Sequence, residues 1–431
     1  MKIRNKKIIY LLSLLIIIFS LLVLLNIKFD YQANKIKYKD QFQNKVFPLF
    51  ISLPDKLKST LLIFTGKRSF NNLFNDYNVK FLPETEYIQL DLKKIKTSFD
   101  KSLSKTFFIE IFGDNLFLIS KSGEFYKANL DEIKNDRIKK INEKIVLDNL
   151  KKDNVNFVIN DVLVIDDKIF VLKASEDNPA NNNCGKLEIY YSSIKDIFNF
   201  NHFKTFNECV GAGIVAGGMQ KYSFNNKSGI LISTVSSNPN PTIGKSQNDN
   251  SIFGKIIFVD FDTKEVIKIS KGHRNPQGLA VRENIILSTE HGPKGGDEIN
   301  KIIYGKNYGW PIASYGLPYP TEKNFQFEKN HEDKGFEEPV YVFLSAVGIS
   351  ELIFLPNSFH PEWRDNVIVS SLNGRSLFRI RFSDNNYDKV LYIEKIFIGE
   401  RIRDLKYSSN QKLIVLALED TGVLGVLNLK E

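Results

Sequence analysis

From about residue 78 onward, the chain alternates short apolar runs with turn-forming residues such as those of Gly113–Asn115, Asp166–Lys168 and Asp384–Asn386. The runs include Tyr87–Leu92, Phe107–Phe112, Leu116–Ile119, Val162–Ile165, Ile169–Lys173, Leu187–Tyr191, Gly229–Thr234, Lys255–Val259, Ile285–Thr289, Val340–Phe343, Leu352–Leu355, Val367–Ser371, Leu377–Phe382 and Leu413–Leu418. Many short strands separated by turns predict an all-β fold. No long helical pattern interrupts the runs, which argues against an α/β fold.

The length of this β region, residues 76–431, favours a propeller over a sandwich. A single sandwich of that length would be unusually large, whereas a propeller divides the chain into four-stranded sheets around an axis. Six blades would hold roughly 60 residues each, which leaves room for long loops. No crisp repeat marks the individual blades.

The N-terminus predicts a membrane anchor. Four positive residues within the first seven positions precede an apolar run from Ile8 to Leu25. Eighteen helical residues would span about 27 Å, close to the hydrocarbon thickness of a bilayer. The positive flank favours the cytoplasmic side. We therefore expect residues 1–28 to form an inner-membrane anchor and residues 29–75 a juxtamembrane stalk. The C-terminal domain would then lie in the periplasm or outside the cell. A cleaved signal peptide is the alternative, but no small-x-small cleavage site follows the run.

The net charge of +9 does not point to nucleic acid. The 59 Lys and Arg residues are scattered among 50 Asp and Glu residues. No basic stripe alternates with aromatic residues, and no nucleic-acid-binding module is recognisable, so we predict no nucleic-acid partner.

The two cysteines, Cys184 and Cys209, suggest a disulfide, because a single pair in an exported domain is usually oxidised. Two free thiols are the alternative. A metal site is disfavoured, because His202 is the only nearby residue that would add a ligand.

Three motifs carry a family resemblance. They read GHRNPQG at Gly272–Gly278, EHGPKGGDEIN at Glu290–Asn300 and NYGWP at Asn307–Pro311. In this order they resemble the aldose sugar dehydrogenases that depend on pyrroloquinoline quinone (PQQ), a branch of the glucose and sorbosone dehydrogenase group. Weaker similarity lies at Asn248–Ile256, Pro361–Arg364, Asn373–Leu377 and Glu400–Asp404, so the resemblance covers roughly residues 150–430. It implies a six-bladed β-propeller that oxidises a sugar with PQQ and calcium.

The resemblance assigns cofactor ligands. It places the backbone carbonyls of Gly292 and Pro293 on the calcium that also holds the quinone, and carbonyl oxygens suit such a hard cation. Calcium there polarises the reactive quinone carbonyl. The family also uses an arginine pair, here Arg401 and Arg403, for the carboxylates of PQQ. Because the two arginines are two residues apart, their side chains would lie on the same face of a strand. A guanidinium group binds a carboxylate in a bidentate way, through two parallel hydrogen bonds. The alternative is a surface pair bridging to the neighbouring acids of Glu400–Asp404.

Three residues of the first motif are expected at the reaction centre. By resemblance, Arg274 and Asn275 lie against the quinone and the substrate and are the candidate catalytic residues. Gln277 is expected to be a third polar contact of the cofactor. Asn275-Pro276 also has the chemistry of a turn, so part of the motif is open to a purely structural role.

A second, structural calcium site is expected from the aldose branch. Glu298 would contribute its carboxylate and Tyr308 a carbonyl oxygen, with Asp297 behind them. His291 is interpreted as a hydrogen-bonded structural histidine, and Trp310 as part of the core.

The chain departs from the family at the general base. Family members carry a histidine in a short HxGGR segment, and it takes the hydroxyl proton of the sugar. The corresponding stretch here, residues 214–219, has Val215 in place of the histidine and Met219 in place of the arginine. His202 is a candidate base only if the local structure is rearranged. The lysine that the family often places near Asn373 is also absent.

Two functions remain open. The first is a periplasmic quinoprotein that oxidises an aldose or related sugar and passes electrons to a quinone or a small carrier. The second is a non-catalytic propeller that binds a sugar, a glycan or a protein, which the loss of the histidine favours. A propeller hydrolase is not supported, because no nucleophile, base and orienting acid form a convincing set.

Overall fold

A computed structural model describes residues 85, 88–101, 105–145, 150, 157–175, 185–196, 199–210, 216–238, 240, 244–319 and 324–430. The chain separates into two units, residues 1–78 and 79–431, and every described residue belongs to the second. The predicted anchor and stalk therefore lie outside the described residues. Within the described residues, no helix is long and apolar enough to cross a membrane.

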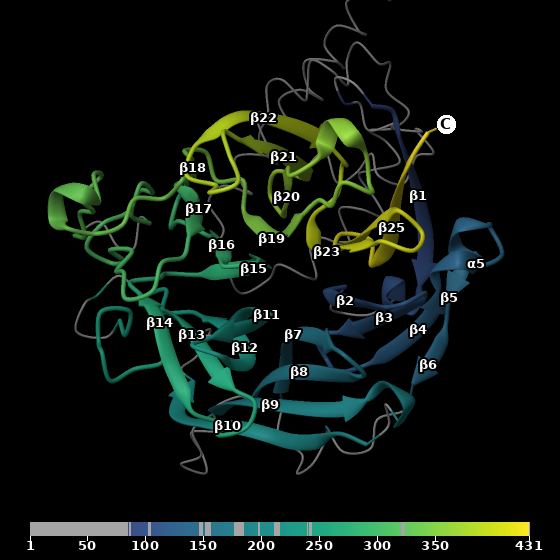
Figure 1. Cartoon of the computed structure of the whole chain (residues 1–431), viewed down its shortest axis with the longest axis horizontal. Helices are drawn as coiled ribbons and strands as arrows, with labels where there is room; N and C mark the ends of the chain where they lie inside the picture. Colours follow the sequence, from purple (N-terminus) through teal and green to yellow (C-terminus); the bar gives the residue numbers. More distant parts are fainter. Residues whose placement is uncertain are drawn as a thin grey trace, which may run out of the picture. The chain divides into compact units, whose positions relative to one another are not determined.

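The described part of the second unit contains six sheets arranged around an axis (Figure 1), and their strands pair antiparallel except for β1 with β5. The first four-stranded sheet holds β2 (Phe107–Phe112), β3 (Asn115–Ser120), β4 (Phe125–Asn129) and β6 (Glu143–Ile145). The next two hold β7 (Phe157–Ile165), β8 (Lys168–Ser175), β9 (Gly185–Ser193) and β10 (Asn201–Val210), then β11 (Ala216–Phe224), β12 (Lys227–Thr234), β13 (Lys255–Asp260) and β14 (Val266–Lys271). The following two hold β15 (Pro276–Arg282), β16 (Ile285–Glu290), β17 (Asp297–Lys301) and β18 (Tyr341–Phe343), then β19 (Ile349–Phe354), β20 (Val367–Ser371), β21 (Ser376–Phe382) and β22 (Val390–Phe397).

The sixth sheet joins the two ends of the propeller chain. It contains β23 (Ile402–Ser408), β24 (Leu413–Leu418), β25 (Val423–Leu429), β1 (Leu90–Thr97) and the short β5 (Lys140–Ile141). β1 pairs antiparallel with β25, so that the first strand completes the last blade. The first strands of neighbouring sheets contact one another in the closed order β2, β7, β11, β15, β19, β23. The predicted six-bladed β-propeller is thus confirmed.

Local sequence explains the hairpins. The β11–β12 turn is made by Asn225 and Asn226, whose φ angles of 49° and 63° are those of a tight hairpin turn that asparagine tolerates. The helical segments of the described residues are short. Asn129 caps α5 (Leu130–Lys134). The 3₁₀ turns lie at Ser98–Lys101, Ile194–Asp196, Glu332–Lys334 and Pro361–Trp363. Apolar side chains of adjacent sheets fill the space between blades, as where Leu116 and Leu118 meet Val415.

Five of the six innermost strands carry a register shift close to their first residues. The shifts lie between Ile159 and Asp161, Ala216 and Met219, Pro276 and Leu279, Ile349 and Leu352, and Ile402 and Leu405. Such β-bulges redirect side chains and are common beside binding sites. Here they turn side chains toward the propeller axis.

Candidate functional site

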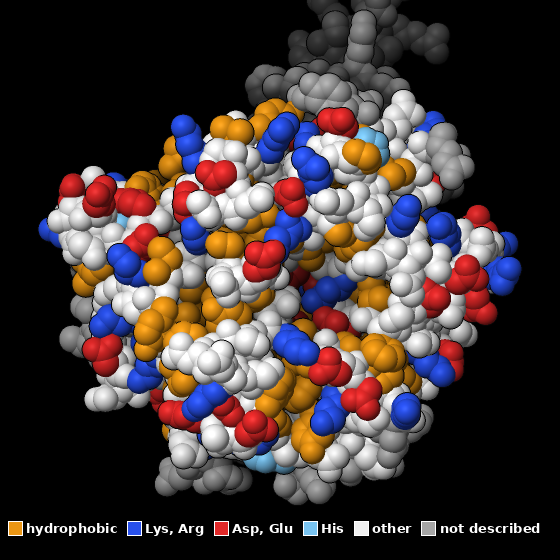
Figure 2. Space-filling view, viewed as in Figure 1, with side chains coloured by type: hydrophobic (Ala, Val, Ile, Leu, Met, Phe, Trp, Pro, Cys, Tyr) orange, Lys and Arg blue, Asp and Glu red, His pale blue; other side chains and the backbone are white. Residues whose placement is uncertain are grey.

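A cavity of about 240 Å³ lies where the innermost strands meet. Figure 2 shows this face of the molecule, which is hollowed near its centre, with cationic and acidic side chains close together there. The cavity is lined by Thr106, Phe108, Lys121, Ile159, Asn160, Asp161, Gly217, Gly218, Val235, Ser237, Asn275, Gln277, Ser350, Glu351, Arg403, Asp404 and Glu419.

The bulges explain most of this lining. Each of the five bulged strands contributes one residue at the equivalent position: Asn160, Gly217, Gln277, Ser350 and Arg403. Four of the strands also contribute the residue that follows: Asp161, Gly218, Glu351 and Asp404. The cavity is therefore built from a repeated backbone feature that carries different chemistry in each blade.

One side of the cavity carries a chain of hydrogen bonds through predicted cofactor residues. Arg403 donates from NH1 to Gln277 Oε1 at 3.3 Å, and Gln277 donates from Nε2 to Asn275 Oδ1 at 2.7 Å. Asn275 Nδ2 lies 3.3 Å from His291 Nδ1. The structure thus brings together Arg403, Gln277 and Asn275, although their sequence positions are far apart.

Three arginines make this side of the cavity electropositive. Burial, together with charge repulsion from Arg403, Arg274 and Arg401, lowers the pKa of His291 to about 4. The imidazole is therefore neutral at pH 7. Its Nε2 hydrogen-bonds the carbonyl of Ile349 while its Nδ1 faces Asn275, so both ring nitrogens are engaged. This environment fits the structural interpretation of His291 and suits an anionic ligand.

The arginine pair of β23 contacts acids other than its sequence neighbours. Arg403 donates to Glu419 Oε2 from Nε at 3.1 Å and from NH2 at 2.9 Å. Arg401 NH2 lies 3.9 Å from the same oxygen, and the Arg401 amide donates to Asp420. Arg403 lines the cavity, whereas Arg401 is not among the lining residues.

The acids next to the arginine pair have other partners. Glu400 pairs with Lys94 at 2.5 Å. Asp404 accepts a hydrogen bond from the backbone of Ile109 at 2.7 Å, in the neighbouring blade. The surface bridges considered from the sequence are therefore absent from this part of the structure.

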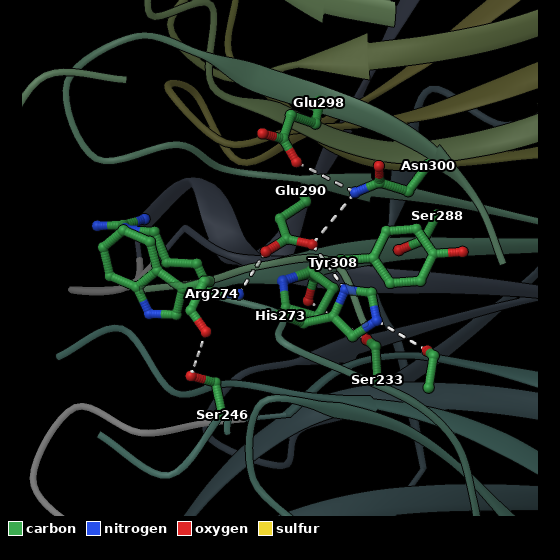
Figure 3. A network of polar contacts seen from close by, with 12 residues as sticks. Ser233, Ser246, His273, Arg274, Ser288, Glu290, Glu298, Asn300 and Tyr308 are labelled. Atoms are coloured by element: carbon green, nitrogen blue, oxygen red, sulfur yellow. Dashed lines mark hydrogen bonds and ion pairs between the residues drawn. The ribbon is translucent and has the colours of Figure 1, made fainter. Parts of the chain in front are cut away.

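A buried network ties the first two motifs together (Figure 3). His273, which has no exposed surface, lies between Ser270 Oγ at 2.8 Å and Glu290 Oε2 at 2.9 Å. Glu290 also accepts the backbone amide of Arg274. Because Glu290 bonds to both the side chain of His273 and the backbone of Arg274, it fixes the backbone at these two residues and so positions the Arg274 side chain.

Arg274 reaches the second and third motifs. Its NH1 donates to the carbonyl of His291 at 2.9 Å, and its guanidinium lies 5.3 Å from the ring centre of Trp310. Trp310 is buried as expected, and its indole donates to the carbonyl of Ser236 at 2.7 Å. Arg274 does not line the cavity, so the structure places it behind Asn275 rather than at the cavity wall.

The Gly292–Pro293 turn is held by Asp297. This carboxylate accepts the amides of Gly292 at 3.1 Å and Gly348 at 2.6 Å. A Cβ on Gly292 would lie 2.1 Å from the carbonyl oxygen of Gly295, so only glycine fits. Burial raises the pKa of Asp297, while the hydrogen bonds from these amides oppose that rise.

Glu298 and Tyr308 lie beside the same network. Glu298 is buried and shares the amide of Asn300 with Glu290, each oxygen 3.3 Å from Asn300 Nδ2. Burial and the charge of Glu290 raise the pKa of Glu298 well above its usual range. The Tyr308 ring stacks on His273, with ring centres 4.6 Å apart. In the described part of the chain, no three His, Cys, Asp or Glu residues are grouped to hold a metal ion.

No histidine lines the cavity. His202 is exposed on β10, at the opposite edge of its sheet from β7, and bonds to Thr205 at 2.7 Å. Val215 lies outside the described residues. Met219 is buried in β11, and its backbone amide donates to Asp161 Oδ2 at 2.6 Å.

Sequence reasoning missed the acidic part of the cavity. Asp161, Glu351 and Asp404 are buried at the axis, close to the ion pair of Lys406 with Glu110 at 2.8 Å. A signal was present, because polar pairs interrupt the apolar runs VINDVLV and GISELIF. Buried polar positions inside strands commonly mark a site.

Cys209 lies in β10, and its expected partner Cys184 lies outside the described residues. The disulfide stays a prediction.

Known proteins are similar to this chain in part of its sequence and in its fold. Residues 227–426 match the family described as Glucose / Sorbosone dehydrogenase. The resemblance seen in the motifs is therefore confirmed over these residues. Solved structures share the fold: a glucose dehydrogenase (TM-score 0.62, 22% identity) covers 79% of this chain and 99% of its own. The soluble aldose sugar dehydrogenase of Escherichia coli in its apo-form (TM-score 0.60, 19% identity) gives the same coverage.

Two named relatives are similar over shorter segments. Aldose sugar dehydrogenase YliI of Escherichia coli is 35% identical over 159 residues, which are 36% of this chain and 42% of the relative. Quinoprotein glucose dehydrogenase B of Acinetobacter calcoaceticus is 59% identical over 123 residues, 27% of this chain and 23% of the relative. The chain thus matches less than half the length of these curated relatives.

Proposed function

We propose that this protein is a quinoprotein that oxidises an aldose or related sugar with PQQ and calcium in the central cavity. The observation that carries the proposal is the chain from Arg403 through Gln277 to Asn275 along one wall of that cavity. It lies within the segment that matches the family. PQQ, when bound, supplies a two-electron acceptor for the hydride of the sugar.

The cationic wall fits the carboxylates of PQQ. After burial, the charges of Arg403, Arg274 and Arg401 contribute to the low pKa of His291. Arg403, at the cavity wall, would bind a carboxylate directly, while Arg401 adds charge behind it. Asn275 and Gln277 would orient the ring through hydrogen bonds.

Calcium belongs to the same proposal. The carbonyls of Gly292 and Pro293 would hold the ion next to the quinone, in a turn that Asp297 fixes. The surroundings of Glu298 fit a second cation. Two buried carboxylates share the amide nitrogen of Asn300 there, and its Oδ1 is buried with no partner among the described residues.

The location follows from the sequence. The apolar run Ile8–Leu25 would anchor the propeller to the inner membrane, with the catalytic domain on the periplasmic side. Electrons would then pass to a membrane quinone or a small carrier.

A binding propeller without turnover is the second candidate. One observation favours it: Val215 and Met219 replace the polar residues of the HxGGR segment, and no histidine lines the cavity. Loss of a general base typically reduces the rate by 10²–10⁴.

PQQ binding tests the proposal. Full-length protein in detergent is titrated with PQQ and calcium by calorimetry, and dye reduction is then followed with a panel of aldoses. We expect Arg403→Gln to weaken PQQ binding by roughly 10- to 100-fold, since a charge-assisted hydrogen bond contributes about 1.5–3 kcal/mol. The matched control is Arg381→Gln, an exposed arginine of β21, which should bind like the wild type. Equal PQQ affinity of the two variants would contradict the binding of the quinone at this wall. PQQ binding without sugar oxidation would favour the binding propeller.

A further inference from the structure

The β7 strand carries polar chemistry that the cofactor does not use. In the closed order of innermost strands, β7 lies across the ring from β19, while Gln277 and Arg403 lie on the two strands that flank β19. The bulged residues of β7, Asn160 and Asp161, therefore approach the cavity from the side opposite the cationic wall.

Asn160 is buried without partners. Its side chain is 7% exposed, and neither Nδ2 nor Oδ1 has a hydrogen-bond partner among the described residues. Leaving a buried amide unsatisfied costs about 1–3 kcal/mol. A ligand in the cavity that both donates and accepts would remove this cost, and hydroxyl groups do both.

Asp161 lies beside Asn160 and has one oxygen engaged. Its Oδ2 accepts the Met219 amide at 2.6 Å, and its Oδ1 makes no hydrogen bond with the described residues. Met219 follows Gly217 and Gly218, the glycines that mark the family's histidine segment. The Asp161 carboxylate thus contacts the described end of the segment in which the family carries its histidine.

The surroundings of Asp161 suit a proton acceptor. Burial, opposed by Lys406 and reinforced by Asp404 and Glu110, raises the pKa of Asp161 to about 8. Glu351 of β19 also interacts with it electrostatically. Lys121, Arg403 and Glu419 are the other charged residues in the cavity wall, and the described part of β11 adds only Gly217 and Gly218 to that wall. A general base is most effective when its pKa is close to the working pH.

The other acids of the wall are less suitable. Both oxygens of Glu419 are engaged, Oε2 by Arg403 and Oε1 by Thr106 at 3.0 Å. Glu351 Oε1 already accepts the backbone amide of Leu352 at 2.9 Å, and burial raises the pKa of Glu351 well above its usual range. Oδ2 of Asp404 accepts a hydrogen bond from the Ile109 amide, and Oδ1 of Asp404 is fully buried.

We propose that Asp161 accepts the hydroxyl proton of the sugar that is oxidised, and that Asn160 binds a neighbouring hydroxyl. The inference rests on the proposed function. The proton of the O–H bond passes to the Asp161 carboxylate, and the adjacent C–H bond breaks as a hydride. Both of its electrons go to the bound quinone, which is the oxidant, and a C=O bond forms. Asp161 thereby takes the role that the family gives to the histidine.

Asp161→Asn separates chemistry from structure, because its amide oxygen still accepts the Met219 amide but takes up no proton. Full-length protein loaded with PQQ and calcium should lose 10²–10⁴ in kcat, with PQQ affinity unchanged. The matched control, Asp166→Asn, changes an exposed residue in the turn that follows the same strand and should keep wild-type kcat. Turnover of Asp161→Asn within threefold of the wild type would overturn the role of Asp161.

Two measurements do not depend on turnover. In an infrared pH titration of the cofactor-free protein, the wild type should lose a carboxylic acid band near pH 8 that Asp161→Asn lacks; identical titrations would contradict the assignment. In calorimetry with the substrate sugar, Asn160→Ala should bind about tenfold more weakly, whereas unchanged affinity would overturn its role.

The outcomes also distinguish this inference from the proposed function. A wild type that binds no PQQ, or binds it and oxidises no sugar, overturns both. A wild type that oxidises sugar while Asp161→Asn remains equally active overturns only the present inference.

Discussion

At the scale of single residues, the charges around the cavity are arranged by burial. Burial and three neighbouring arginines hold the pKa of His291 low, while burial and neighbouring acids raise the pKa values of Glu298 and Glu351. An anionic ligand would meet one wall and a hydroxyl-rich ligand the other. A cavity with two chemically different walls suits a reaction that joins an acidic cofactor to a neutral sugar.

His291 predicts an acid-dependent loss of stability. Its pKa is lowered from 6.5 to about 4 in the folded protein, so the unfolded chain takes up a proton first as the pH falls. The contribution of neutral His291 to folding is complete above about pH 6.5 and is lost between about pH 6.5 and 4, by up to about 3 kcal/mol. Chemical unfolding of the wild type and His291→Gln across this range measures the difference.

The stability gap between these two proteins should narrow as the pH falls. The buried acids with raised pKa values act in the opposite direction, but they are present in both proteins and cancel in the comparison. A gap that is constant from pH 7 to pH 4 would show that His291 titrates normally.

At the scale of strands, the apolar pattern predicted the blades well. The run Phe107–Phe112 coincides with β2, and Leu413–Leu418 coincides with β24. These segments are buried by their own blades, so their composition reports their structure. The pairing of β1 with β25 was not predictable, because the partners lie at opposite ends of the propeller chain and neither sequence specifies the other.

The bulges at the cavity explain why the site was predicted only in part. Arg403 and Gln277 were found because family motifs contain them. Asn160 and Asp161 were missed, because a bulge depends on the register with the neighbouring strand and not on local composition. The one local clue was a polar pair within an apolar run.

Closure of the ring makes β25 important for stability. Leu427 in β25 pairs with Leu92 of β1 and is fully buried. Leu427→Ala should lower the free energy of unfolding by about 2–5 kcal/mol, because it removes buried methyl groups and leaves a cavity. Leu391, 58% exposed on β22, provides the control: Leu391→Ala should change stability by less than about 0.5 kcal/mol. Urea unfolding of both variants measures the contrast, and equal losses would argue against closure by this strand.

At the scale of the whole propeller, the three family motifs converge on one part of the ring. Glu290, in the second motif, bonds to Asn300 of the same motif and to His273 of the first motif. The ring of His273 in turn stacks on Tyr308 of the third motif. Cations bound there would link segments that otherwise depend on buried, partly uncompensated acids. Calcium is therefore expected to stabilise the fold as well as the quinone.

Chelation provides the last test. Treating the cofactor-free, full-length protein with excess EGTA should lower its Tm, and added calcium should restore it, since a ligand at 100 times its Kd stabilises the folded state by about 2.7 kcal/mol. Magnesium should restore less of the Tm, because it is a smaller ion that requires nearly ideal octahedral coordination by oxygen. Glu298→Gln should reduce the calcium-dependent rise in Tm, whereas Glu332→Gln, at an exposed 3₁₀ turn, should retain it. If EGTA leaves the Tm unchanged and calcium titration gives no heat, this network binds no calcium, and the propeller folds without the metal.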